Sequence, residues 1–252
     1  MAKVTAPFKI TGTLDDLNFY MTQGNINLVR TKGKTGVTSE QFKTNPIFTK
    51  VRNHGSEFGH CVKTSRQFRM LAHQFNLKAK DGSFAGRANK LLYEILQEDV
   101  INEHGKRTVT NGLDTTDGKE YLIGFEGNKL RPLHNILKTN WIWDEEAQSL
   151  KIDNFNPLQH LDWPENATHV HLAVSRSNWD YKNGTFTPSY SEEYTYIKEA
   201  TATSLSIKPS IPAENNLHVI FLYIGFSLQQ RKKLKLLKRA NNTVSLIKVL
   251  PF

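Results

Sequence analysis

The chain has 252 residues, of which 33 are Lys or Arg and 24 are Asp or Glu, and its formal net charge at pH 7 is +9. A chain of this length can bury a hydrophobic core without disulfides, and its one cysteine, Cys61, excludes an internal disulfide. The longest apolar run, 217–226, is too short to span a bilayer, and the N-terminus lacks the apolar stretch of a signal peptide. We therefore expect a cytoplasmic protein, or a part of a particle assembled in the cytoplasm, with no signal peptide.

The charge is distributed unevenly along the chain. Residues 1–90 contain 15 Lys and Arg against 5 Asp and Glu, residues 91–230 contain 11 against 19, and residues 231–252 contain 7 against none. The chain is therefore basic, then acidic, then basic again. Such zones allow one copy to attract another head to tail.

The first 37 residues are expected to form a β-hairpin followed by a basic connector. Segment 8–13 alternates apolar and polar residues, and segments 18–22 and 26–31 do so on either side of a turn in which Gly24 supplies a positive φ. The connector at 32–36 lacks the Walker spacing of a phosphate-binding loop. We therefore expect no nucleotide chemistry from this loop.

A helical region is predicted over 38–138. Thr38 is placed to cap a short helical turn, and Asn45 and Pro46 suit the start of a long helix over 45–75. Its heptad seam consists of Val51, His54, Phe58, Cys61, Ser65, Phe68, Ala72 and Phe75. Gly55 and Gly59 are expected to let another backbone approach, and Cys61 is expected to be a buried small hydrophobe.

A second helix is predicted over 84–102, capped by 81–83 and paired with the first helix as a helical hairpin. On the first helix Arg52, Lys63 and Arg66 fall within about 60° of one another, so they form a basic ridge beside the seam. This ridge is either a solvated flank or a surface for phosphate or an acidic partner.

From residue 139 onward the pattern indicates strands. Segments 141–143, 150–152, 169–175, 195–198, 204–208, 218–228, 232–237 and 244–250 alternate or are rich in β-branched and aromatic residues, with turn residues between them. Segment 219–226 is apolar on both faces and is predicted to be a central strand. The fold class is therefore α+β: an N-terminal β-hairpin and a helical hairpin followed by an antiparallel β-sandwich over 139–252.

Candidate catalytic and metal-binding groups are sparse. His54, Glu57 and Cys61 share a helical face without a fourth ligand, and His169 and His171 are expected to be exposed on one strand face without a carboxylate partner. Common hydrolase motifs do not occur. We expect no enzyme activity, no catalytic residue, no metal site and no cofactor.

Two surfaces suggest alternatives to a structural role. The basic run at 231–239 is either a lysine-protected edge strand or a nucleic-acid patch. The four tryptophans at 141–179, together with the acidic pairs Glu145-Glu146 and Glu192-Glu193, suggest a carbohydrate-binding β-sandwich or the aromatic filling of a core.

Three segments carry a resemblance to other proteins. They are ITGT, NFY and VR within 10–30, GSEFG at 55–59, and WPENATHV at 163–170. In these the chain resembles a set of uncharacterised proteins from Bacteroidota bacteria. The resemblance implies a bacterial source and carries no activity over to this chain.

Our leading hypothesis is a non-enzymatic structural or assembly subunit. It would self-associate as a homo-oligomer or dock onto a protein partner through charge-complementary surfaces; nucleic acid is the alternative partner, and a small-molecule substrate is not expected. The predicted interaction surface consists of Arg30, Lys32, Lys34, Arg52, Lys63, Arg66, Arg231, Lys233 and Lys235.

Overall fold

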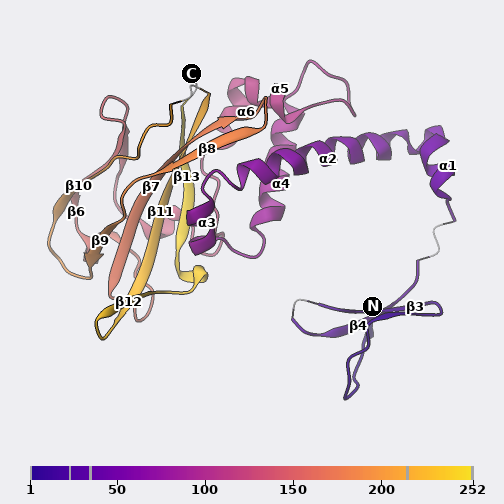
Figure 1. Ribbon diagram of the computed structural model, residues 1–252, viewed down its shortest axis with the longest axis horizontal. Coiled ribbons are helices and arrows are strands. Elements are labelled where there is room, and N and C mark those ends of the chain that lie inside the picture. Colours follow the sequence, from indigo (N-terminus) through magenta and orange to yellow (C-terminus); the bar gives the residue numbers. More distant parts are fainter. Residues whose placement is uncertain (1, 23, 34–35, 214–215, 251–252) are drawn as a thin grey trace. The chain divides into compact units, whose positions relative to one another are not determined.

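The computed structural model describes residues 2–22, 24–33, 36–213 and 216–250. It divides into two compact units, residues 1–49 and residues 50–252 (Figure 1). The first unit contains strands and a short helix. The second contains helices followed by a large antiparallel sheet region, so the predicted α+β class is confirmed.

The N-terminal unit is built on a four-stranded antiparallel sheet in the order β1-β4-β3-β2. Its strands are β1 (Ala2–Lys3), β2 (Gly12–Leu14), β3 (Leu17–Met21) and β4 (Asn27–Thr31). The predicted hairpin is the β3–β4 pair, in which Phe19 lies opposite Val29. In its turn the positive φ, 61°, belongs to Asn25, contrary to our assignment to Gly24; asparagine tolerates this conformation better than most residues.

Local capping signals in the same unit are confirmed. Thr38 forms a capping box with Gln41 at the start of α1 (Ser39–Thr44). Asn45 accepts a hydrogen bond from the backbone N–H of Ile47 at 3.0 Å, and this cap begins the 3-10 helix η1 (Pro46–Phe48). Each cap involves a residue only two or three positions away, so both can be predicted from the sequence.

The predicted long helix is broken into two, which corrects our single element over 45–75. Helix α2 spans Thr49–Phe68 and α3 spans His73–Ala79, with a turn at 69–72 between them. The Asn76 side chain donates to the carbonyl of Arg69 at 2.9 Å and holds this turn. Leu71 and Ala72, at the turn, are fully buried. Their packing in the core therefore favours a break in the helix at this point.

The seam of α2 is also corrected at its N-terminal half. Cys61, Ser65 and Phe68 are buried as expected, but Val51 and Phe58 are 55% and 51% exposed. Gly55 and Gly59 have no heavy atom within 4 Å of where a Cβ would stand, so no backbone approaches them closely. Gly55 instead borders an open groove of about 580 Å³ between α2 and α4.

The second predicted helix is shorter than expected. Helix α4 (Phe84–Gln97) ends five residues before our predicted boundary at 102, where Asp99 accepts backbone hydrogen bonds from Ile101 and Asn102 and turns the chain. The others are α5 (Val109–Asp114), α6 (Thr116–Glu120), α7 (Leu133–Ile136), α8 (Pro157–His160) and the 3-10 helix η2 (Arg239–Asn241).

The second unit contains two antiparallel sheets. The six-stranded sheet has β12-β11-β7-β8 in order, with β13 also paired to β11 and β9 to β7, and the three-stranded sheet has the order β10-β6-β5. Their bounds are β5 (Ile142–Asp144), β6 (Ser149–Phe155), β7 (His169–Asp180), β8 (Thr185–Tyr190), β9 (Tyr194–Ile197), β10 (Thr203–Ile207), β11 (Leu217–Gln230), β12 (Lys233–Leu236) and β13 (Thr243–Leu250). All eight predicted strands are present; β8 was missed.

Strand β11 is the central strand that we predicted, and it separates two apolar clusters. Val219, Phe221 and Tyr223 face a cluster that includes residues of α2 to α5, while Ile220 and Leu222 face a cluster that includes residues of β6 and β10. Figure 1 shows helices α2 to α6 beside the large sheet and β6 and β10 beyond it. The helices and the large sheet therefore share the first of these two apolar clusters.

Candidate functional site

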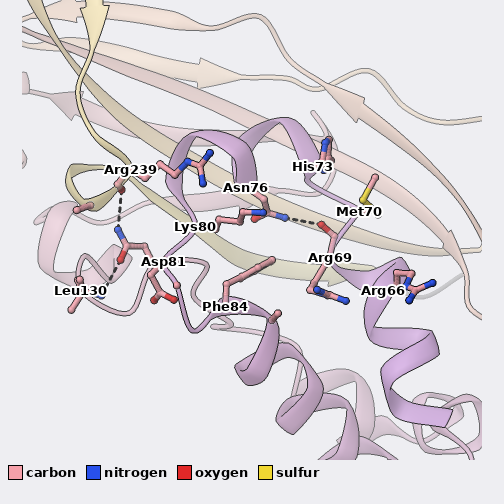
Figure 2. A pocket seen from close by; sticks show the side chains of 14 residues that line it. Arg66, Arg69, Met70, His73, Asn76, Lys80, Asp81, Phe84, Leu130 and Arg239 are labelled. Carbon is pink, nitrogen blue, oxygen red and sulfur yellow. Dashed lines mark hydrogen bonds between the residues drawn. The ribbon is translucent and has the colours of Figure 1, made fainter. Parts of the chain in front are cut away.

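The second unit carries a cavity of about 660 Å³ whose wall is strongly basic (Figure 2). Arg66 belongs to the last turn of α2, and Arg69 and His73 follow it where the helix breaks. Lys80 follows α3, and Arg239 begins η2 near the other end of the chain. The break after α2 and the docking of η2 against α3 thus bring two separate basic segments to one cavity.

One carboxylate, Asp81, also lines this cavity, but its charge is already compensated. Arg87 forms an ion pair with Asp81 at 2.7 Å, and the backbone N–H of Lys129 donates to the same carboxylate at 2.7 Å. Burial alone would raise the pKa of Asp81, yet the hydrogen bonds from Arg87 and Lys129 lower it to about 2. Asp81 is therefore ionised at neutral pH and committed to Arg87.

Of the predicted basic ridge of Arg52, Lys63 and Arg66, one residue belongs to this cavity. Arg66 lines the cavity, whereas Lys63 is exposed on α2 away from its lining and Arg52 lies near the start of the same helix. Arg69, His73 and Lys80 were not among our predicted residues. The signal that could have located them is the density of basic residues around the end of α2.

The predicted basic residues of the N-terminal unit that the structure describes, Arg30 and Lys32, do not line the basic cavity of the second unit. Arg30 is exposed and lies over the ring of Tyr20, 5.5 Å from its centroid, and Lys32 is exposed after β4. Lys34 lies outside the described residues.

The basic run near the C-terminus forms an edge, as one of our two interpretations had it. Strand β12 pairs with β11 through Ser227 to Gln230, and all four of its residues are exposed, including Lys233 and Lys235. Arg231 occupies the turn between the two strands with a φ of 57°. Lysines on an edge strand protect it from pairing with other chains, and here they also place positive charge at the surface.

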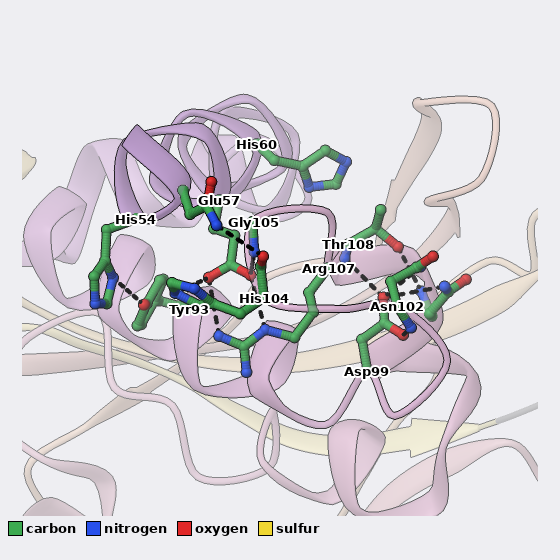
Figure 3. A network of polar contacts seen from close by, with 12 residues as sticks. His54, Glu57, His60, Tyr93, Asp99, Asn102, His104, Gly105, Arg107 and Thr108 are labelled. Atoms are coloured by element: carbon green, nitrogen blue, oxygen red, sulfur yellow. Dashed lines mark hydrogen bonds and ion pairs between the residues drawn. The ribbon is translucent and has the colours of Figure 1, made fainter. Parts of the chain in front are cut away.

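A buried ion pair joins α2 to the segment after α4 (Figure 3). The Glu57 side chain is fully buried, and its carboxylate accepts hydrogen bonds from Arg107 Nε at 2.8 Å, from Arg107 Nη2 at 2.9 Å and from the backbone N–H of Gly105 at 2.7 Å. The hydrogen bonds from Arg107 lower the pKa of Glu57. This arrangement anchors the loop at 104–108 to α2.

His54, Glu57 and His104 offer ligand atoms within 4.8 Å of one another, which is close enough for a metal ion. However, Arg107 occupies both Glu57 oxygens, and a guanidinium in that position repels a cation. His54 Nδ1 is also engaged with the Tyr93 hydroxyl at 2.8 Å. The three side chains therefore fit a polar network better than a metal site. We had grouped Cys61 with His54 and Glu57, but its thiol instead donates a hydrogen bond to the carbonyl of Leu92. Burial raises the pKa of its thiol to about 12.

A second polar relay lies on the large sheet and corrects our expectation of an exposed His171. This side chain is buried; its Nε2 lies 2.7 Å from Ser227 Oγ and its Nδ1 lies 2.9 Å from Glu193. The hydrogen bond to His171 and a second one from Lys78 lower the pKa of Glu193 to about 2. A Ser–His–Glu order is the order of a nucleophile, a base and an orienting carboxylate.

The relay nevertheless lacks an open nucleophile. Ser227 is 1% exposed and sits in the regular ladder between β7 and β12, and it is not among the residues that line the basic cavity beside α3. A substrate carbonyl therefore has no path to its Oγ. We interpret the relay as a satisfied buried polar network that ties β9 and α3 to the sheet.

The four tryptophans pack into the apolar clusters of the second unit. Trp179 is fully buried, Trp141, Trp143 and Trp163 pack against the second apolar cluster, and no tryptophan of the chain is exposed. This is the second of the two interpretations that the sequence allowed.

No helix in the described part of the chain combines the length and apolar character needed to cross a membrane. No protein-family model, curated protein or solved structure matches this chain.

Proposed function

We propose that the protein is a non-enzymatic assembly subunit that associates with further copies of itself through its N-terminal unit. The observation that carries this proposal is the lack of an apolar core in that unit. Within its described residues Asn27 is the one buried side chain, and it is polar. Its amide donates to the carbonyls of Ile10 at 2.7 Å and Tyr20 at 3.3 Å.

Several apolar side chains of this unit are exposed, which is unfavourable in water. Phe8 and Leu14 are each 65% exposed and Ile47 is 76% exposed. Small sheets gain their stability from burying one face, at about 25 cal/mol per Å² of apolar surface. Taken by itself, the four-stranded sheet buries no apolar side chain completely, and a second copy that covers one of its faces would supply this burial.

The charge distribution favours a second copy as that partner. Residues 1–90 and residues 91–230 carry opposite net charge, so the basic zone of one copy complements the acidic zone of the next. A contact between two different surfaces repeats from copy to copy and builds rings or filaments.

The test compares the full-length protein with two double variants by size-exclusion chromatography with light scattering, at low and moderate salt. Phe8→Asp with Leu14→Asp is expected to convert an oligomer into a monomer. The matched control is Val100→Asp with Ile101→Asp, because these side chains are equally apolar and 88% and 78% exposed on the other unit. A wild-type protein that is monomeric at both salt concentrations, with no particles in negative stain, would refute the proposal.

Nucleic acid is the second candidate partner, and the observation that favours it is the exposed basic strand β12 with the turn at Arg231 that joins it to the exposed end of β11. A two-stranded ribbon fits the major groove, and phosphate contacts make binding depend steeply on salt. Charge reversal of Lys233 and Lys235 should then abolish oligonucleotide binding. Absence of binding by nuclease-treated protein at low ionic strength would exclude this candidate.

A further inference from the structure

The basic cavity beside α3 contains more positively charged side chains than the acidic side chains around it neutralise. Arg66, Arg69, Lys80 and Arg239 line it, and none of them forms an ion pair with a described residue. Like charges gathered in a concave site repel one another and concentrate anions there. We propose that this cavity binds a small phosphorylated molecule of nucleoside-diphosphate size.

The basic groups are held in place by contacts that leave their charges free. Arg69 Nε donates to the carbonyl of Ser65 at 3.1 Å, and its own carbonyl accepts from Asn76. Asn128 donates to the carbonyl of Arg239 at 3.2 Å and fixes the start of η2. Guanidinium groups with free Nη atoms bind phosphate oxygens in pairs, so two or three of them suit a diphosphate.

The basic side chains approach the cavity from two sides (Figure 2). Figure 2 shows Arg66 and Arg69 together at the end of α2, and Lys80 with Arg239 on the other side. This placement suits a group with charge on several oxygens better than a single carboxylate. His73 lies on the same wall and adds a hydrogen-bonding group.

Apolar residues form the rest of the wall. Phe84 is buried, Leu130 is largely exposed, and Met70 and Ala85 complete the apolar part of the lining. The volume of about 660 Å³ lies within the range of small-molecule sites, which are mostly apolar with a few convergent polar groups. The ligand therefore combines a phosphate with a flat apolar body. We had not expected a small molecule from the sequence.

The test is isothermal titration of the full-length protein with ADP and with inorganic pyrophosphate at low ionic strength. ADP is expected to bind with one site per chain and more tightly than pyrophosphate, because pyrophosphate has no group to cover Phe84 and Leu130. Arg66→Gln with Arg239→Gln should weaken ADP at least about tenfold, which is the loss of roughly one charge-assisted hydrogen bond. Both side chains are exposed, so these variants should fold, as circular dichroism would verify.

Lys233→Gln with Lys235→Gln is the matched control, since it removes the same charge from β12, outside the cavity. This control should bind ADP within about twofold of the wild type, the scatter expected for distant independent sites. The inference fails if the wild type binds neither probe, if both double variants weaken binding equally, or if pyrophosphate binds as tightly as ADP. These residues lie outside the N-terminal unit, so that failure would leave the assembly proposal standing.

Discussion

Arg107 donates two hydrogen bonds to the carboxylate of Glu57, at 2.8 and 2.9 Å, although the two residues lie 50 positions apart in the chain. The Glu57 side chain is fully buried and the Arg107 side chain is 19% exposed. This pair, together with Gly105, connects α2 to the loop after α4. Its removal is therefore expected to act on the stability of the second unit.

Glu57→Gln is expected to lower the free energy of unfolding by about 3 kcal/mol, because the guanidinium of Arg107 is left without its counter-charge in a largely buried site. Urea denaturation monitored by circular dichroism measures this change. Glu94→Gln is the control, since the Lys90–Glu94 pair is exposed and spans 3.6 Å; it should cost less than about 0.5 kcal/mol. Equal effects of the two substitutions would show that the buried pair contributes no more than a surface pair.

Glu126 makes the stability depend on pH. Burial raises the pKa of its carboxyl from 4.5 to about 7, and its Oε2 is buried without a hydrogen-bond partner. Between these two pKa values the folded chain retains a proton that the unfolded chain has released. The free energy of unfolding should therefore fall as the pH rises through this window, by up to about 3 kcal/mol.

Glu126→Gln tests this contribution because it keeps the shape of the side chain and removes its titration. Urea midpoints measured near pH 5 and near pH 8 should differ less in the variant than in the wild type. Identical pH dependence in both proteins would mean that Glu126 is not the titrating group.

Two helical glycines are expected to respond to alanine in opposite directions. A Cβ at Gly112 would stand 1.9 Å from the carbonyl oxygen of Ile95, whereas a Cβ at Gly59 would meet nothing within 4 Å. Gly112→Ala should therefore cost about 3 kcal/mol or more, through overpacking between α4 and α5. Gly59→Ala should gain about 0.5 to 1 kcal/mol by restricting the unfolded chain and favouring the helix. Thermal unfolding of both variants measures the two changes, and a destabilising Gly59→Ala would reveal a close neighbour at that position.

Ser227 is expected to be chemically inert in the folded protein. Its Oγ lies 2.7 Å from His171 Nε2, which is the geometry of an activated nucleophile, but the residue is 1% exposed. A fluorophosphonate probe should therefore leave the native protein unlabelled in mass spectrometry. Labelling that disappears in a folded Ser227→Ala variant would identify a reactive serine and argue against a purely structural role.

Several features followed from the sequence because they depend on near neighbours. The caps at Thr38 and Asn45, the burial of Cys61, and the central position of β11 can all be read from spacing over a few residues. Strand β8 escaped detection, since Pro188 lies within it and none of its residues is fully buried. Proline lowers the strand signal, although it fits where its missing N–H faces away from the ladder.

Other features were decided by tertiary structure alone. The periodicity of 45–75 runs through the point where the chain leaves α2, and only the burial of Leu71 and Ala72 against the sheet makes the turn at 69–72 favourable. That turn places Arg69 and His73 beside Arg66, and the docking of η2 adds Arg239. No local sequence pattern shows that charged residues far apart in the chain will lie close together in the fold. The basic composition was therefore visible from the sequence, and the cavity that gathers it was not.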